Sequence, residues 1–157
     1  MSFVKDKDTD NYYSNFQVWD RIKQFIPKDK VIWDPFYGDG QSGSDMETLG
    51  FNVIHKDIDF FENNLGDVLI SNMPFSKRRV IFERLKELGK PFIMVGLSSY
   101  LSNKWFMNLF GDGIQVIIPM KRISFYHIEN KLENYTCRGG AWYYCYNMNL
   151  KKDITLI

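Results

Sequence analysis

Short apolar segments alternate with helix-forming segments along most of this chain, and this alternation restricts its fold more than any other feature. The apolar segments have the length and composition of strands, and they cover residues 31–33, 51–55, 67–71, 91–97 and 113–119. The segments between them carry helical spacing or helix-end signals, and they cover residues 44–49, 77–88 and 102–111, the last with Ser102 as its N-cap. Strands that alternate with helices form mostly parallel sheets with helices on both faces. The sequence therefore predicts an α/β fold.

The two ends of the chain depart from this alternation. Apolar positions at helical spacing predict a helix over residues 12–26, which Pro27 would end. Residues 124–128 and 141–148 are rich in aromatic and β-branched side chains and are joined by a polar loop, so we expect an antiparallel C-terminal hairpin. Residues 1–10 are polar and are expected to be a mobile segment, followed by a single domain over residues 11–157.

The composition excludes several classes of protein. Of the 157 residues, 45% are hydrophobic and 25% are charged, which is typical of one globular domain. The net charge of +1 argues against a strongly basic nucleic-acid coat protein but allows a local basic patch. Cys137 and Cys145 lack metal-ligand spacing, so we expect neither a metal site nor a disulfide framework. The sequence shows no secretory signal and no apolar run long enough for a membrane, so we expect a cytoplasmic protein that is not secreted.

A glycine-rich turn follows the first predicted strand. Residues 34–43 read Asp-Pro-Phe-Tyr-Gly-Asp-Gly-Gln-Ser-Gly, which places the spacing G-x-G-x-x-G between a strand and a helix. Glycines allow the backbone to approach a ligand closely. One interpretation is a dinucleotide site, with Asp57 as the ribose ligand about 20 residues further on. Another is a site for S-adenosylmethionine, and a plain tight turn is the third.

The Asp-Pro pair before the glycines favours S-adenosylmethionine. A dinucleotide fingerprint does not contain this pair, and the Asp34 carboxylate suits the ammonium group of a methionine tail. No Gly-Lys-Ser/Thr follows, so the loop is not a P-loop. The residues that we expect to contact the cofactor from this loop are Asp34, Pro35, Phe36, Gly38 and Gly40.

Two carboxylates follow the second predicted strand. Asp57 can accept hydrogen bonds from both hydroxyl groups of a ribose, and Asp59 can accept one from the exocyclic amine of an adenine. Phe60 can pack against the adenine ring. Because the carboxyl ends of parallel strands meet at one edge of a sheet, we expect these residues beside the glycine loop. The alternative is that both carboxylates belong to a solvated surface loop.

A family resemblance becomes visible after the third predicted strand. Ser71-Asn72-Met73-Pro74-Phe75 resembles the Asn-Pro-Pro-Phe/Tyr motif of the amino-methyltransferases. With the Asp34–Gly40 loop, the chain is similar to the S-adenosylmethionine-dependent adenine-N6 DNA methyltransferases, in particular to the small single-domain members of phages and large viruses. Weaker similarities cover residues 12–148, and they lie at Tyr12–Asn15, Trp19, Ile118-Pro119, Arg122–Phe125 and Ala141-Trp142. The resemblance implies a Rossmann-like class I methyltransferase fold, S-adenosyl-L-methionine as cofactor, and Tyr13 near its methionine end.

The resemblance also implies roles for the Asn72–Phe75 motif. The side-chain oxygen of Asn72 and the backbone carbonyl of Met73 would accept hydrogen bonds from the target amine and direct its lone pair toward the methyl group. Phe75, held in place after Pro74, would stack on a base that is flipped out or single-stranded. Met73 departs from the usual proline: it keeps the carbonyl but lacks the fixed φ of proline. Two alternatives therefore stay open, a methyltransferase for protein glutamine amides and a catalytically inactive member that binds protein or nucleic acid.

Basic residues near this motif suggest a nucleic-acid partner, with DNA favoured over RNA. Lys77, Arg78 and Arg79 begin a predicted helix, where cations are unfavourable, and Lys121 and Arg122 lie on another loop of the same sheet edge. A solvated charged surface is the alternative. The aromatic side chains that could stack on bases are Tyr126, Trp142, Tyr144 and Tyr146. No separate recognition domain fits in the chain, so sequence specificity must be low, come from loops or require a protein partner, and a homodimer is a further assembly that we consider.

Overall fold

The computed structural model describes residue 10 and residues 12–127, 133–135 and 139–157, which form two sheets. The main sheet has seven strands in the order β3-β2-β4-β5-β9-β6-β10. Their bounds are Asn52–Ile54 (β3), Val31–Trp33 (β2), Val68–Asn72 (β4), Phe92–Leu97 (β5), Ala141–Tyr146 (β9), Ile114–Ile118 (β6) and Ile154–Leu156 (β10). All neighbouring pairs are parallel except those of β9, which is antiparallel to both β5 and β6. The predicted α/β fold with a mostly parallel sheet is therefore confirmed.

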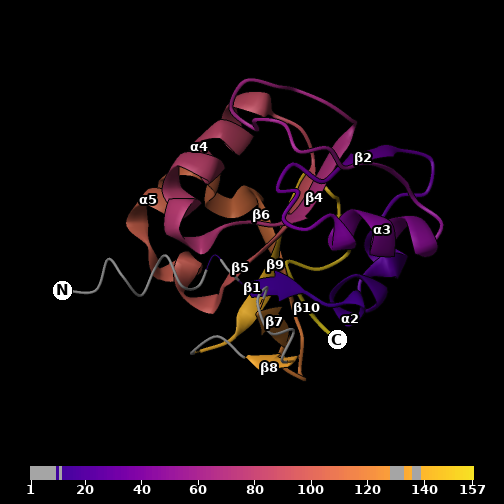
Figure 1. Ribbon diagram of the computed structural model, residues 1–157. Helices are drawn as coiled ribbons and strands as arrows, with labels where there is room; N and C mark the ends of the chain where they lie inside the picture. The colour runs from indigo at the N-terminus through magenta and orange to yellow at the C-terminus, as the bar shows by residue number, and fades with distance from the viewer. Residues whose placement is uncertain (1–9, 11, 128–132, 136–138) are drawn as a thin grey trace.

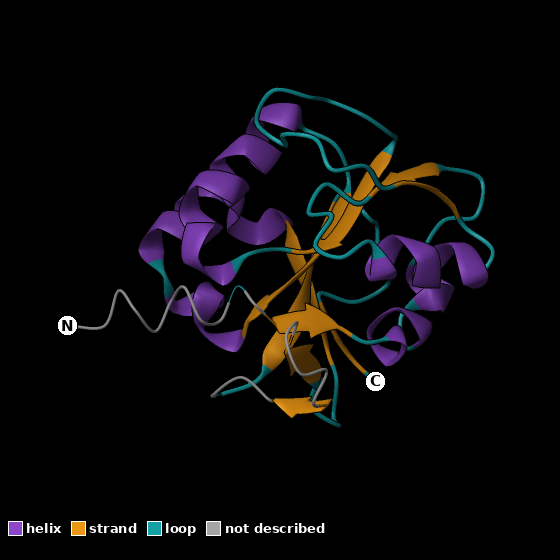
Figure 2. Ribbon diagram, in the orientation of Figure 1, coloured by secondary structure: helices purple, strands orange, loops and turns teal. Residues whose placement is uncertain are grey.

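Helices cover both faces of this sheet. Figure 1 shows α4 (Arg78–Leu88) and α5 (Lys104–Phe110) on one side, and α2 (Phe16–Asp20) and α3 (Gln41–Thr48) on the other. Figure 2 shows the same layers with the strands between them. Short 3-10 turns connect the elements, and they are η1 (Lys23–Phe25), η2 (Phe75–Lys77), η3 (Ser98–Ser102) and η4 (Gly111–Gly113). None of the helices in the described part of the chain is long and apolar enough to cross a membrane.

The predicted C-terminal hairpin is wrong. Residues 125–127 form β7 (Phe125–His127), which belongs to a second, three-stranded sheet with β1 (Tyr12–Ser14) and β8 (Glu133–Tyr135). The other half of the expected hairpin is β9, and it lies inside the main sheet rather than at its edge. Tyr143, Tyr144 and Cys145 are all fully buried, because both faces of β9 are covered. A strand without a polar face is typical of the centre of a covered sheet.

The helix expected over residues 12–26 is also wrong at its start. Residues 12–14 pair with β7 in the register Tyr13↔Tyr126, so they are extended. Asn15 then caps α2, because its side-chain oxygen accepts a hydrogen bond from the Gln17 amide at 3.1 Å. The helical spacing of the apolar residues correctly predicted only the short helices α2 and η1. Similarly, Asn103 rather than Ser102 is the N-cap of α5, and β10 was not predicted.

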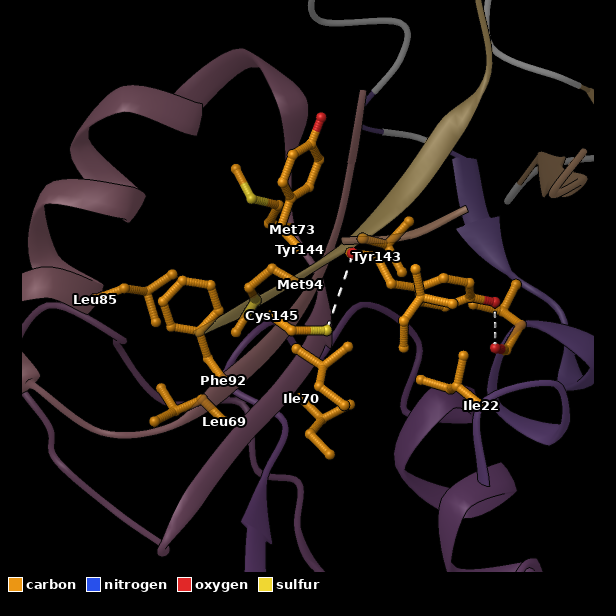
Figure 3. Close-up of a cluster of buried hydrophobic side chains, with 14 of the residues drawn as sticks. Ile22, Leu69, Ile70, Met73, Leu85, Phe92, Met94, Tyr143, Tyr144 and Cys145 are labelled. Atoms are coloured by element: carbon orange, nitrogen blue, oxygen red, sulfur yellow. Dashed lines mark hydrogen bonds between the residues drawn. The ribbon is translucent and has the colours of Figure 1, made fainter. Parts of the chain in front are cut away.

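Aromatic side chains fill the core between the sheet and the helices α4 and α5. The ring of Phe82 lies at the centre of this aromatic cluster, and its partners are Phe92, Tyr100, Trp105, Phe106, Phe110 and Tyr144. Figure 3 shows Leu69, Ile70, Phe92, Met94 and Cys145 gathered around the neighbouring strands β4, β5 and β9. Tyr144 was expected to be available for base stacking, but it is fully buried and donates a hydrogen bond from its hydroxyl group to the Leu97 carbonyl. The high aromatic content therefore serves packing to a large extent.

Residues 1–9 and Cys137 lie outside the described residues, so the expected mobile segment and the expectation that Cys137 forms no disulfide stay predictions. Asp10 is described, and its carboxylate accepts a hydrogen bond from the Ser76 amide at 3.2 Å. The thiol of Cys145 is fully buried, and this burial raises the pKa of Cys145 to about 12. Cys145 is therefore a residue of the hydrophobic core.

Removing the Phe82 ring tests the aromatic cluster. We expect Phe82→Ala to lower the free energy of unfolding by about 3–5 kcal/mol, because a large cavity is left between α4 and the sheet. Val80→Ala, on the same helix but 48% exposed, should change it by less than about 0.5 kcal/mol. Urea denaturation measures both, and equal effects would contradict the assigned core.

Candidate functional site

A pocket of about 260 Å³ lies at the point in the main sheet where the order of the strands reverses. The chain adds β3 on one side of β2 and then β4 on the other side, so the carboxyl ends of β2 and β4 diverge into two adjacent loops. Ligands of open α/β sheets bind at such a switch point. The pocket is lined from four segments, which contribute Asp10 and Tyr12–Ser14, Phe36–Asp39 and Ser42, Asn72–Phe75, and Phe125.

The glycine loop makes one wall of the pocket. Gly38 and Gly40 have φ values of 59° and 82°, a left-handed conformation that favours glycine. Between them, the Asp39 carboxylate accepts a hydrogen bond at 3.1 Å from the amide of Gln41, the first residue of α3, whose N-cap is Gly40. Its second oxygen accepts a hydrogen bond from the Tyr126 hydroxyl group at 2.6 Å. Asp39 therefore holds the loop against β7 of the second sheet.

The third glycine of the motif has a packing role in this structure. Gly43 lies inside α3, and a Cβ atom at this position would be 2.2 Å from the Cγ atom of His55. The His55 ring stacks on Tyr37 with 6.3 Å between the ring centres, and its Nε2 atom is 2.8 Å from a carboxylate oxygen of Glu47. Close helix–strand packing thus explains Gly43 without a ligand.

Asn72, at the end of β4, brings an unused hydrogen-bond acceptor to the opposite wall. Its side-chain oxygen is buried and has no hydrogen-bond partner among the described residues. Such an atom is costly to bury unless a ligand or water satisfies it. Met73 and Phe75 are 2% and 7% exposed, and the Phe75 ring meets Phe125 edge-on with 6.2 Å between the centres. The Asn72–Phe75 motif and the glycine loop therefore share one pocket, as the sequence predicted.

The N-terminal strand closes the pocket with residues that carry polar groups. Ser14 is 1% exposed, and its hydroxyl group has no partner among the described residues. The Tyr13 ring lies against Gly38, where a Cβ atom would be 3.4 Å from it, and meets Tyr126 edge-on. Burial and the nearby charge of Asp39 raise the pKa of Tyr13. Tyr13 thus lies in the pocket wall, and its expected place near the methionine end of a cofactor stays a prediction.

Sequence reasoning missed Ser14, Asp39 and Asp10 as site residues, and it named Tyr126 for base stacking, not for its hydrogen bond to Asp39. Asp10 and Ser76 are joined by two hydrogen bonds, one from the Ser76 amide and one from its hydroxyl group, at the mouth of the pocket. The position of Asp39 between two glycines, just before a helix, was the available signal for its contact with the Gln41 amide. The contributions of Asp10 and Tyr126 depend on contacts between distant segments, and no local pattern in the sequence indicates them.

Asp34 and Pro35 are buried and do not line the pocket. The Asp34 side chain is fully buried, and its Oδ1 atom accepts a hydrogen bond from the Ser71 hydroxyl group at 2.5 Å. Its Oδ2 atom has no partner among the described residues. Burial raises the pKa of Asp34 to about 7, although the Ser71 hydroxyl group, the charge of His55 and the Phe36 amide each lower it. Gly40, likewise, lies beside the pocket and not in its lining.

Asp57 and Asp59 lie on the surface beyond β3 and do not line this pocket. The Asp59 carboxylate accepts a hydrogen bond from the Phe61 amide at 2.6 Å. Phe60 is 3% exposed and packs on Phe36, a residue of the pocket wall, with 5.0 Å between the ring centres. A ligand that contacts both the pocket and these carboxylates must therefore extend past Phe36. Their assignment to ribose and adenine stays a prediction.

The basic residues named from the sequence differ in their surroundings. Arg79 forms an ion pair with Glu83 at 3.1 Å, and Arg78 donates a hydrogen bond to the Phe75 carbonyl at 3.2 Å. Lys77, Lys121 and Arg122 are exposed and have no ion pair within the described part of the chain. Of the five basic residues named from the sequence, these three are the most available to a polyanion. Over the described ranges, no group of three or more His, Cys, Asp or Glu side chains could hold a metal ion.

Comparison with solved structures finds distant similarity. No protein-family model matches the chain, and no curated protein matches it. Among solved structures, it is similar to a protein of Pyrococcus horikoshii described as a "putative RNA methyltransferase", with 14% sequence identity and a TM-score of 0.45. The similarity covers 83% of this chain and 79% of that one.

The packing role of Gly43 can be tested by Gly43→Ala. The added methyl group would overlap His55, so we expect a loss of about 1–3 kcal/mol in the free energy of unfolding, although alanine favours a helix more than glycine does. The double variant Gly43→Ala/His55→Gly should be more stable than the sum of the two single changes predicts, because glycine removes both the Cβ atom and the ring of His55 that the added methyl group would overlap. Urea denaturation of all four proteins measures this coupling, and simple additivity would refute the packing role.

Proposed function

We propose that this chain is an S-adenosylmethionine-dependent methyltransferase that acts on the N6 amine of adenine in nucleic acid, with DNA favoured over RNA. The observation that carries the proposal is the shared pocket: the glycine loop forms one wall, and Asn72 presents a buried, unpartnered acceptor from the other. The class I methyltransferase fold is part of the same proposal. It is supported by the mostly parallel sheet, the helices on both faces and the pocket at the switch point.

The residues around the pocket fit the polar part of such a cofactor. Ser14 offers a hydroxyl group without a partner, and the left-handed turn at Gly38 allows close approach of the backbone. A volume of about 260 Å³ is at the small end for a complete ligand, so the adenosine end would extend past Phe36 toward Asp57. The cofactor, when bound, supplies a methyl group on a positively charged sulfur atom.

The protein would contribute orientation and hydrogen-bond acceptors. The exocyclic amine of adenine is a weak nucleophile, because its lone pair is delocalised into the ring. The Asn72 side-chain oxygen and the Met73 carbonyl would accept its two hydrogen atoms and leave the lone pair facing the methyl group. The Asn72 oxygen is buried in the pocket wall, so a hydrogen bond from the base would satisfy it. The base must be flipped out of a duplex or single-stranded to reach it.

Two alternatives make different demands on the same site. A protein glutamine amide would offer an amine of similar shape, but the exposed Lys77, Lys121 and Arg122 favour a polyanionic substrate. A catalytically inactive member would keep the fold and lose transfer. Met73 motivates that second alternative, since it is buried in the pocket wall at the position of the usual proline.

Replacing Asn72 separates binding from chemistry. We expect Asn72→Ala to leave the affinity for S-adenosylmethionine within about threefold, roughly 0.7 kcal/mol, because Asn72 is assigned to the target amine. Turnover should fall at least ~100-fold, about 2.7 kcal/mol of transition-state stabilisation. Single-turnover transfer of labelled methyl groups to adenine-containing oligonucleotides measures the rate, and calorimetry measures the affinity.

The exposed Asn108→Ala on α5 is the matched control and should behave as wild type. Transfer to a protein extract but not to DNA or RNA would support the glutamine alternative. If the parent protein transfers methyl groups to none of these, the adenine proposal fails and the inactive alternative is favoured.

Salt dependence tests the nucleic-acid partner. Combined replacement of Lys77, Lys121 and Arg122 by alanine should weaken oligonucleotide binding and flatten the slope of log K against log salt by about 0.7–0.9 for each phosphate contact that is lost. Lys104→Ala, a change of an exposed lysine on α5, should leave the slope as it is. Fluorescence anisotropy at several salt concentrations gives the slopes. An unchanged slope would show that these three cations face solvent and contact no phosphate.

A further inference from the structure

Asp34 occupies a position from which it can influence both walls of the pocket. It directly follows β2 and precedes the glycine loop, while Ser71 directly precedes Asn72 in β4. The hydrogen bond between Ser71 and Asp34 therefore joins the bases of the two loops that line the pocket. The Asp34 amide also donates a hydrogen bond to the Ile54 carbonyl of β3 at 2.9 Å. One residue thus connects three neighbouring strands at the switch point.

The Asp34 carboxyl group is incompletely satisfied in this position. Oδ1 accepts the Ser71 hydroxyl group, but Oδ2 is buried and has no partner among the described residues. The charged and polar groups that face it are Ser71 from β4, His55 after β3, and the Phe36 amide of its own loop. None of these is a fixed cation in contact with Oδ2. An ionised carboxylate here is therefore costly unless a positive charge is brought near it.

We propose that Asp34 is a positioning residue that carries a proton in the ligand-free protein and releases it to solvent when a cationic ligand enters the pocket, while Ser71 holds its carboxyl group between the two loops. The inference rests on the proposed function, because S-adenosylmethionine is the cation considered. Charges interact over several ångströms in a dry interior, so direct contact between Asp34 and the ligand is not required. The raised pKa of Asp34 agrees with this assignment.

The sign of the pH dependence follows from linkage. The ionised form of Asp34 binds a cation more tightly, so ligand affinity should rise with pH up to about 7 and then level off. In the ligand-free protein the effect on stability is opposite. Because the pKa of Asp34 is raised above its unfolded value, the folded state holds the proton more tightly, and the folding constant should fall by up to about tenfold per pH unit between about pH 4 and 7.

The ligand-free protein provides the first test. Asp34→Asn keeps an acceptor for the Ser71 hydroxyl group but cannot ionise, so its urea denaturation should lack this loss of stability with rising pH. Ser71→Ala removes a hydrogen bond that favours the ionised form, so the same loss should extend to higher pH. Infrared spectroscopy should show a protonated carboxyl band near neutral pH that Asp34→Asn lacks. An Asp34 that is ionised throughout the neutral range overturns the proposal and leaves cofactor binding untouched.

Calorimetry in two buffers of different ionisation enthalpy provides the second test. At pH 7, S-adenosylmethionine should release up to about 0.5 proton per molecule bound, since a group with a pKa near 7 is half protonated there. S-adenosylhomocysteine, which lacks the sulfonium charge, should release less. Asp34→Asn should release none from this site, and the exposed Asp112→Asn is the control that should match wild type.

The outcomes separate this inference from the proposed function. Equal proton release by wild type and Asp34→Asn overturns the role of Asp34 while cofactor binding stands. Absence of S-adenosylmethionine binding, with the infrared band present, overturns the cofactor assignment and the ligand-linked step together but leaves the protonated Asp34 established.

Discussion

The parallel pairing of β2 with β4 is the contact on which the candidate site depends. These strands are far apart in the sequence, and β3 takes the other side of β2, so their carboxyl ends open into a pocket instead of being covered. The glycine loop and the Asn72–Phe75 motif are functional neighbours only because of this pairing. The hydrogen bond from Ser71 to Asp34 links the ends of the same two strands, and the hydrogen bond from Tyr126 to Asp39 ties the glycine loop to β7 of the second sheet.

Much of the main sheet could be predicted because each strand is a local signal. The apolar runs before Asp34, before His55 and up to Asn72 are bounded by turn residues, and each became a strand within one or two positions. The sequence did not predict which strands pair when the partners are far apart along the chain. The aromatic run over 141–146 indicates a strand but not its neighbours, and a polar loop before it suggested a hairpin. Insertion between β5 and β6 is decided by burial of both faces, which periodicity does not encode.

For the site, the sequence identified the two central motifs and could not place the rest. Residue type and position at strand ends were sufficient to place Asn72 and Gly38 beside the pocket, because both follow strands of a parallel sheet. Asp34 illustrates the limit: its neighbourhood in the sequence suggested a ligand contact, whereas its side chain is buried against Ser71. Whether a carboxylate faces solvent or the interior depends on the adjoining strand, and that information lies in another part of the chain.

The second sheet has a consequence for the order in which the molecule assembles. Asn15 donates a hydrogen bond to the Ser124 carbonyl, 109 positions further along the chain, and this contact flanks the pairing of β1 with β7. Such contacts require closure of a very long loop and gain little from local structure. We therefore expect the pocket wall formed by Tyr13 and Ser14 to be completed late in folding, after the strands of the main sheet have paired. A chain that begins after Ser14 would then keep all strands of the main sheet and lose the part of the pocket wall that Tyr13 and Ser14 form.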